Sequence, residues 1–196
     1  MTPGGFGRRN DPAAGSAAAG TWVRLVGMAL FTVVVVFVMV NVHELGHTIV
    51  ARLAGDPTAS YHLYQRFPDG GFCIGCNVYD ASRLTGTAAA LMALGGVFAT
   101  QAVVLVSLLT HRRLPVRART YVAVVGVVFF LDLVVQLVQG GLRDVTDPPS
   151  GVDVADFVAV AGGGGVPGMW GVRAVVLAAS ALYVAALVHL VRHRRQ

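Results

Sequence analysis

Two histidines and a glutamate stand close together in the stretch "HELGH", where His43 and His47 enclose Glu44 and Gly46. On a helix, residues four apart project from one face one turn apart, so both imidazoles can bind a single metal ion. Glu44 lies beside the first histidine, within reach of a water molecule on that metal. Gly46 leaves room for a close neighbour. The pattern predicts a zinc site in which Glu44 is the general base.

The motif leaves the third protein ligand of such a zinc ion open. Glu44 is the only glutamate in the chain, so the choice lies among the aspartates, His62 and the pair Cys73 and Cys76. The two cysteines form the single stretch "CIGC", and without a second pair they are at least as well explained as a local disulfide or two free thiols.

Two aspartates lead this choice. Asp153, in "PPSGVDVADF", returns at about the depth of the histidines, although its ordinary interpretation is a helix N-cap or a loop residue. Asp132 lies inside an apolar stretch, where it needs a partner: it is a ligand, an acceptor for a ligand histidine, or part of a polar cavity. We rank Asp153 narrowly first and keep Asp132 as the alternative.

Four amide side chains could bind an unwound peptide or an oxyanion. They are Gln136, Gln139, Asn41 and Asn77, and the two glutamines are the preferred substrate-binding candidates. For each one taken singly, a hydrogen bond between helices or solvation at the membrane interface is the more common role.

The elements that must position these residues are membrane helices. The chain has 196 residues, of which 55% are hydrophobic and only 13% are charged, whereas a soluble domain has about a quarter charged. A bilayer core needs roughly 20 apolar residues per helix. Four stretches qualify, at about residues 25–53, 85–110, 120–140 and 172–191. We expect an all-α membrane protein with about four transmembrane helices, preceded by a disordered, Gly/Ala-rich segment at 1–21.

The charged residues predict an orientation. Net charge is +5, but the arginines form short clusters between the apolar stretches, which indicates topology signals and argues against nucleic acid as a partner. With the N-terminus inside, ten of the fifteen arginines fall in inner segments. Both termini are predicted to be cytoplasmic, in a bacterial or archaeal cell membrane. The outer segment 55–84 could form a short hairpin or lie at the interface.

These residues resemble the site-2 protease family of intramembrane zinc metalloproteases. The similarity rests on "HELGH" in an apolar helix and on the small-residue stretch "LMALGGVFATQAVVL" in the next one. It implies that residues 22–196 are one metalloprotease-like domain, with a three-helix catalytic core and one C-terminal helix. In the family, an aspartate of a Leu-Asp-Gly motif completes the zinc site. Neither Asp132 nor Asp153 precedes a glycine, but only Asp153 closely follows prolines.

The resemblance implies an endopeptidase that cleaves a transmembrane or membrane-adjacent segment of another protein, with Zn²⁺ as cofactor and Glu44 as general base. Its partners would be a membrane protein substrate and the lipid bilayer, with a homo-oligomer left open. Two alternatives are a catalytically silent zinc-binding scaffold and a cation transporter that uses Asp132 and the histidines.

Overall fold

Helices dominate the computed structural model, which describes residues 12–68, 70–142, 153–163 and 165–193. The elements in chain order are α1 (Pro12–Leu53), β1 (Ser60–Arg66), β2 (Phe72–Val78), a short 3-10 helix (Ala81–Arg83), α2 (Thr87–Ala93), α3 (Gly95–Thr110), a second 3-10 helix (His111–Arg113), α4 (Val116–Leu142), α5 (Asp153–Ala161) and α6 (Val166–His193). The predicted all-α membrane class is confirmed, with one small two-stranded sheet as the exception.

Three helices in the described chain are long and apolar enough to cross a membrane: Thr21–Leu53, Val116–Gly140 and Pro167–His189. The pair formed by α2 and α3 also passes this test, but it is bent by 50° at a short break. Helices suit such sequences because each backbone N–H and C=O forms its hydrogen bond within the same helix. The bilayer core contains no water that could form these bonds instead. The predicted span at 85–110 is therefore a broken helix.

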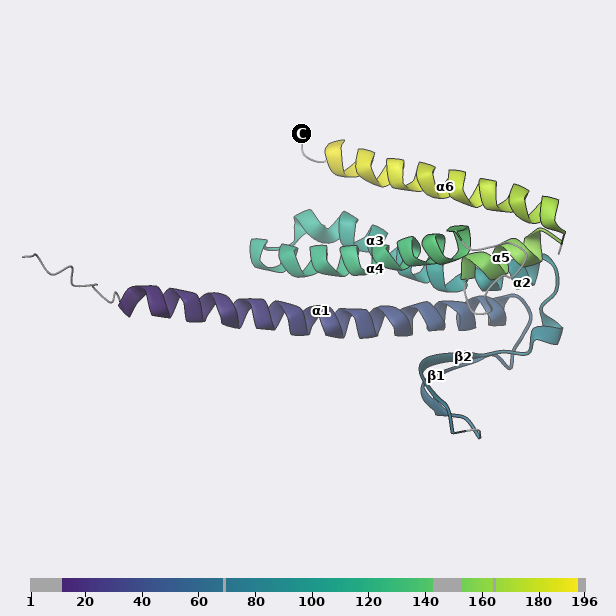
Figure 1. Ribbon diagram of the computed structural model, residues 1–196, viewed down its shortest axis with the longest axis horizontal. Coiled ribbons are helices and arrows are strands. Elements are labelled where there is room, and N and C mark those ends of the chain that lie inside the picture. Colours follow the sequence, from purple (N-terminus) through teal and green to yellow (C-terminus); the bar gives the residue numbers. More distant parts are fainter. Residues whose placement is uncertain (1–11, 69, 143–152, 164, 194–196) are drawn as a thin grey trace, which may run out of the picture.

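The long helices run side by side, and the end of α1 and the start of α6 lie at the same end of the bundle (Figure 1). α1 and α4 run toward the hairpin, while α3 and α6 run away from it. The helix α1 begins at Pro12, so residues 12–21, expected in the disordered segment, are helical instead. The rest of that segment, 1–11, lies outside the described residues.

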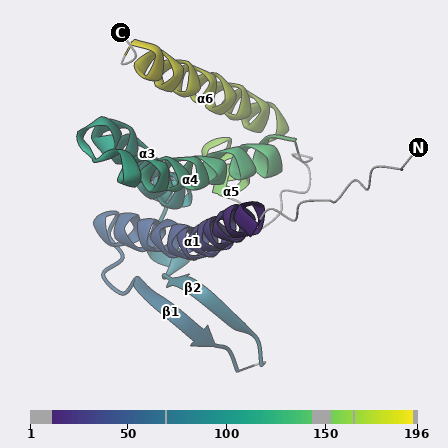
Figure 2. The ribbon, with the colours of Figure 1, turned by 90° about the vertical axis from the view of Figure 1, so that its left-hand side faces the viewer.

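The segment 55–84 contains an antiparallel hairpin, in which Ser60 pairs with Val78 and Arg66 with Phe72. Figure 2 shows it projecting from the bundle beside α1. Cys73 and Cys76 form a disulfide within β2. The short-hairpin interpretation is therefore confirmed.

Asp56 fastens the hairpin to the end of α1. Its carboxylate accepts hydrogen bonds from the Thr58 hydroxyl at 2.5 Å and from the Asp80 backbone N–H at 2.7 Å. These two bonds are the main reason that the pKa of Asp56 lies below its ordinary value of 3.8. The two chain segments that flank the hairpin are thereby tied to one buried side chain.

Glycines set how closely the helices approach around the HELGH turn. A Cβ atom at Gly46 would overlap with the backbone oxygen of Gly95 and the Cβ of Ala99, so α1 and α3 cross in backbone contact. At Gly140 a Cβ would lie 2.7 Å from the Cβ of Val154, so α4 admits α5 equally closely. Both contacts bring polar side chains of different helices within reach of each other.

Candidate metal centre

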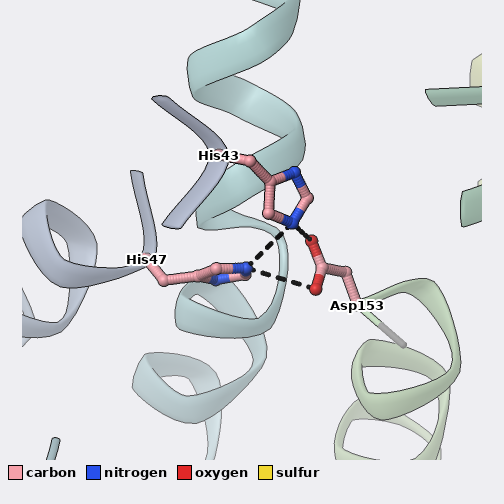
Figure 3. A group of neighbouring side chains, drawn as sticks. All are labelled: His43, His47 and Asp153. Carbon is pink, nitrogen blue, oxygen red and sulfur yellow. Dashed lines mark hydrogen bonds and ion pairs between the residues drawn. The ribbon is translucent and has the colours of Figure 1, made fainter. Parts of the chain in front are cut away.

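Three side chains converge at one point between α1 and α5, as Figure 3 shows. His43 Nε2 lies 2.9 Å from Asp153 Oδ2, and His47 Nε2 lies 3.2 Å from Asp153 Oδ1. The two Nε2 atoms are themselves 3.2 Å apart. All three residues are buried, and one ligand atom from each lies within 4.8 Å of the others, which is the spacing of groups that could share a metal ion.

The other nitrogen of each imidazole is held by an acceptor. His43 Nδ1 lies 3.0 Å from Asp132 Oδ2, and His47 Nδ1 lies 2.7 Å from the backbone oxygen of Met92. A carbonyl oxygen has no proton to give, so His47 must carry its proton on Nδ1, and the carboxylate favours the same tautomer in His43. When both imidazoles are neutral, their Nε2 atoms present lone pairs to the centre of the cluster, as zinc-binding histidines do.

Three acceptors thus face one another in a buried space. Asp153 Oδ2 is close to His43 Nε2, yet it accepts no hydrogen bond of acceptable geometry from the described residues. Lone pairs in such proximity repel unless a cation or a proton lies between them. A divalent cation would also balance the two buried carboxylates of Asp132 and Asp153. The donor set of two imidazoles and one carboxylate fits zinc.

Asp132 lies on the far edge of the His43 ring from Asp153. Its Oδ2 accepts a hydrogen bond from Thr100 Oγ1 at 2.7 Å and bonds His43 through Nδ1, the nitrogen that does not face the cluster. Asp132, the alternative third ligand, therefore lies where it accepts a hydrogen bond from His43 and orients its imidazole ring. Asp153 is the aspartate that the structure brings together with both Nε2 atoms.

The contacts of Asp132 continue into a network that the sequence analysis did not identify. Gln101 donates from Nε2 to the Phe129 backbone oxygen at 3.1 Å, and Tyr183 of α6 donates to Gln101 Oε1 at 3.2 Å. Thr100 is fully buried, and Gln101 nearly so. The signal in the sequence was the polar pair "TQ" inside an otherwise apolar helix, since such groups need partners within the membrane.

Glu44 lies on the wall of a cavity of about 530 Å³ next to the cluster. The lining includes His47, Asn77, Asp153 and Asp156, together with aliphatic residues of α2 and α5. Asn77 of β2 donates from Nδ2 to Glu44 Oε2 at 3.0 Å. The hairpin therefore reaches the site directly and holds one oxygen of this carboxylate.

The remaining candidates from the sequence lie elsewhere. Gln136 is half-buried and Gln139 is exposed, and neither lines the cavity beside Glu44. Asn41 accepts a hydrogen bond from the Tyr61 hydroxyl, which joins α1 to the hairpin. His62 is exposed on β1 and bonds the Ser60 hydroxyl at 3.0 Å. Neither His62 nor the disulfide-bonded cysteines are part of the cluster.

Comparison with known proteins adds no relative: no protein-family model, curated protein or solved structure matches the chain. Any function must therefore be argued from the site.

Proposed function

We propose that the protein is an intramembrane zinc endopeptidase. The observation that carries this proposal is the convergence of three buried acceptors, His43 Nε2, His47 Nε2 and the Asp153 carboxylate, beside a cavity lined by Glu44. A zinc ion held by His43, His47 and Asp153 would keep a fourth position open, as catalytic zinc sites do. The resemblance of "HELGH" to the site-2 protease motif supports the same conclusion.

The chemistry divides between the metal and Glu44. Zinc at this position would supply Lewis acidity, which makes water more acidic and a peptide carbonyl more electrophilic. Glu44 takes the proton of the attacking water and delivers it to the amine nitrogen that leaves. Asn77 holds Glu44 Oε2, so the carboxylate turns its other oxygen to this proton transfer.

The substrate that fits this site is an extended segment of another membrane protein. A transmembrane helix hides its carbonyl groups in internal hydrogen bonds, so it must unwind before a peptide bond can react. The cavity lies among α1, α2, α5 and β2, near the end of α1 that meets the hairpin.

We place both termini in the cytoplasm, because arginines gather at their end of the bundle. A reporter fused to the C-terminus that is active only outside the cytoplasm should stay silent.

Zinc content tests the metal. Protein purified in detergent without chelators should hold about one zinc per chain. His47→Ala should lose it, while His62→Ala, which removes an exposed histidine outside the cluster, should keep it. A wild-type protein without zinc, or equal zinc in both variants, would overturn the metal site.

Glu44→Gln then separates a protease from a silent zinc scaffold. The variant should retain zinc, because Glu44 is not in the ligand cluster, and should lose cleavage. New protein N-termini in membranes of cells that produce wild type, compared with cells that produce Glu44→Gln, would identify substrates. Identical N-termini in the two sets of membranes, with zinc bound in both proteins, would favour the scaffold.

A further inference from the structure

A second cavity, of about 650 Å³, lies between α3, α4 and α6. It is lined by the second half of α3, the first half of α4 and the last turns of α6, so it lies at the end of the bundle opposite the hairpin. Aliphatic side chains form most of its wall. The metal cluster and Glu44 take no part in it.

The helix α6 is joined to the bundle at several points along its length. Met169 packs against Val154 and Val158 of α5. Tyr183 donates a hydrogen bond to Gln101, and Leu187 packs against the core cluster that includes Val104. Figure 2 shows α6 inclined to α3 and α4, with its C-terminal end farther from them than its start. Leu187 and Val188 line the cavity.

Basic residues line the same end of the cavity. His111, Arg112 and Arg192 are among its lining residues. No aspartate or glutamate occurs anywhere in residues 104–131 or 166–196. An apolar space within the membrane therefore opens toward a group of arginines that no acidic residue of these segments neutralises.

We propose that this cavity binds an anionic phospholipid. One acyl chain lies along the aliphatic wall, and the phosphate group is bound by Arg112 and Arg192. Basic pockets between transmembrane helices recognise acidic lipid headgroups in this way. Aliphatic side chains of α3, α4 and α6 line the cavity along the length that an acyl chain would follow. The charge on its rim selects the anionic lipid over a zwitterionic one.

Native mass spectrometry of the delipidated full-length protein tests the proposal. Phosphatidylglycerol and phosphatidylcholine with identical acyl chains are titrated separately. Wild type should bind phosphatidylglycerol about tenfold more tightly or better, since each arginine near the headgroup contributes several-fold. The double variant Arg112→Gln/Arg192→Gln should lose roughly 20- to 30-fold in affinity for phosphatidylglycerol and should no longer prefer it.

Two matched controls distinguish a specific lipid-binding site from general electrostatic attraction of the lipid to this end of the protein. Arg113→Gln/Arg117→Gln removes the same charge from the same end without touching the lining, and should change affinity less than about threefold. Ala123→Phe fills the cavity and should weaken both lipids, whereas Ala102→Phe, at an exposed position outside the lining, should not. Equal affinity of wild type for the two lipids would overturn the proposal. So would equal losses in the two arginine pairs, or a dimer that Ala123→Phe dissociates.

Discussion

The cavity beside Glu44 and the cavity between α3, α4 and α6 lie at opposite ends of the bundle and are made by opposite kinds of packing. Around the cluster of His43, His47 and Asp153, glycines let helix backbones touch, and imidazoles, carboxylates and amides reach across the contacts. At the other end, bulky aliphatic side chains line the space, and α6 diverges from its neighbours. Close backbone approach thus encloses polar groups that need one another, whereas looser packing leaves an apolar space that lipid can fill.

The same contrast applies to charge. Asp132, Asp153 and both motif histidines are buried and are linked to one another by contacts of 2.9 to 3.2 Å. The arginines at the far end are largely exposed at the mouth of their cavity. Buried ionisable groups in a membrane are costly, so the first arrangement indicates a site for chemistry and the second indicates recognition at the membrane surface.

The largest effect is expected from matched glycine substitutions at the two ends. A Cβ at Gly96 would overlap with the imidazole ring of His43, so Gly96→Ala should displace that ligand, abolish zinc binding and lower the free energy of unfolding by about 1–3 kcal/mol. At Gly126 the Cβ would lie 3.4 Å from the Cβ of Ser107, an ordinary contact, so Gly126→Ala should be neutral or slightly stabilising. Zinc content and thermal unfolding measure both. Full zinc binding in Gly96→Ala would contradict the inference that His43 packs directly against Gly96.

A smaller loss should follow from weakening the support of His43. Asp132→Asn removes the charge that holds His43 Nδ1, and zinc affinity should fall about 10- to 100-fold, as is usual for groups behind a metal ligand. Chelator competition measures the change. Asp156→Asn is the matched control, because Asp156 lines the neighbouring cavity but is not in the ligand cluster. If Asp132→Asn removed zinc entirely while Asp153→Asn retained it, the two aspartates would have to exchange roles.

The hairpin should affect cleavage without affecting the metal. Asn77→Leu removes the hydrogen bond to Glu44, so cleavage of an identified substrate should fall about 10-fold or more while zinc content stays unchanged. Asn41→Leu breaks a neighbouring contact between helix and hairpin without touching Glu44 and serves as the control. Equal activity losses in the two variants would mean that Asn77 acts only by holding the hairpin in place.

The smallest effect concerns the hairpin itself and depends on pH. The pKa of Asp56 is below its ordinary value, because Thr58 and the Asp80 N–H donate to the ionised form. Its stabilisation is therefore complete above pH 3.8 and is lost as the pH falls through the lower pKa of the folded state. The near-UV circular dichroism of the hairpin tyrosines should weaken over that acid range. Asp56→Asn should remove this transition, and an unchanged transition in the variant would assign it to other carboxyl groups.

The apolar membrane stretches and the helical spacing of the motif could be predicted from the sequence. Long apolar stretches predict membrane helices from composition alone, and the i, i+4 spacing places His43 and His47 on one face. The break between α2 and α3 escaped prediction, because "LMALGG" contains no proline and its glycines are also common inside membrane helices. The hydrogen bond that His47 Nδ1 donates to the Met92 backbone oxygen, near the break, could not be predicted for the same reason.

Which of the two aspartates faces both histidines could not be predicted without the fold. Asp132 and Asp153 both suit a metal ligand by residue type and depth, and only the packing of α5 against α4 decides which faces the two Nε2 atoms. Gly140 permits that packing, but a glycine in an apolar helix does not reveal its neighbour. The polar pair Thr100 and Gln101 likewise indicates a need for partners without naming them.

The order of the metal cluster along the chain has a consequence for biosynthesis. The ribosome delivers His43, Glu44 and His47 to the membrane first, Asp132 much later, and Asp153 only when α5 emerges. During insertion α1 therefore carries its polar groups without their final partners, and the half-made protein lacks the carboxylate that completes the cluster. Under the proposed function, the ligand set for zinc is complete only once α5 has been synthesised.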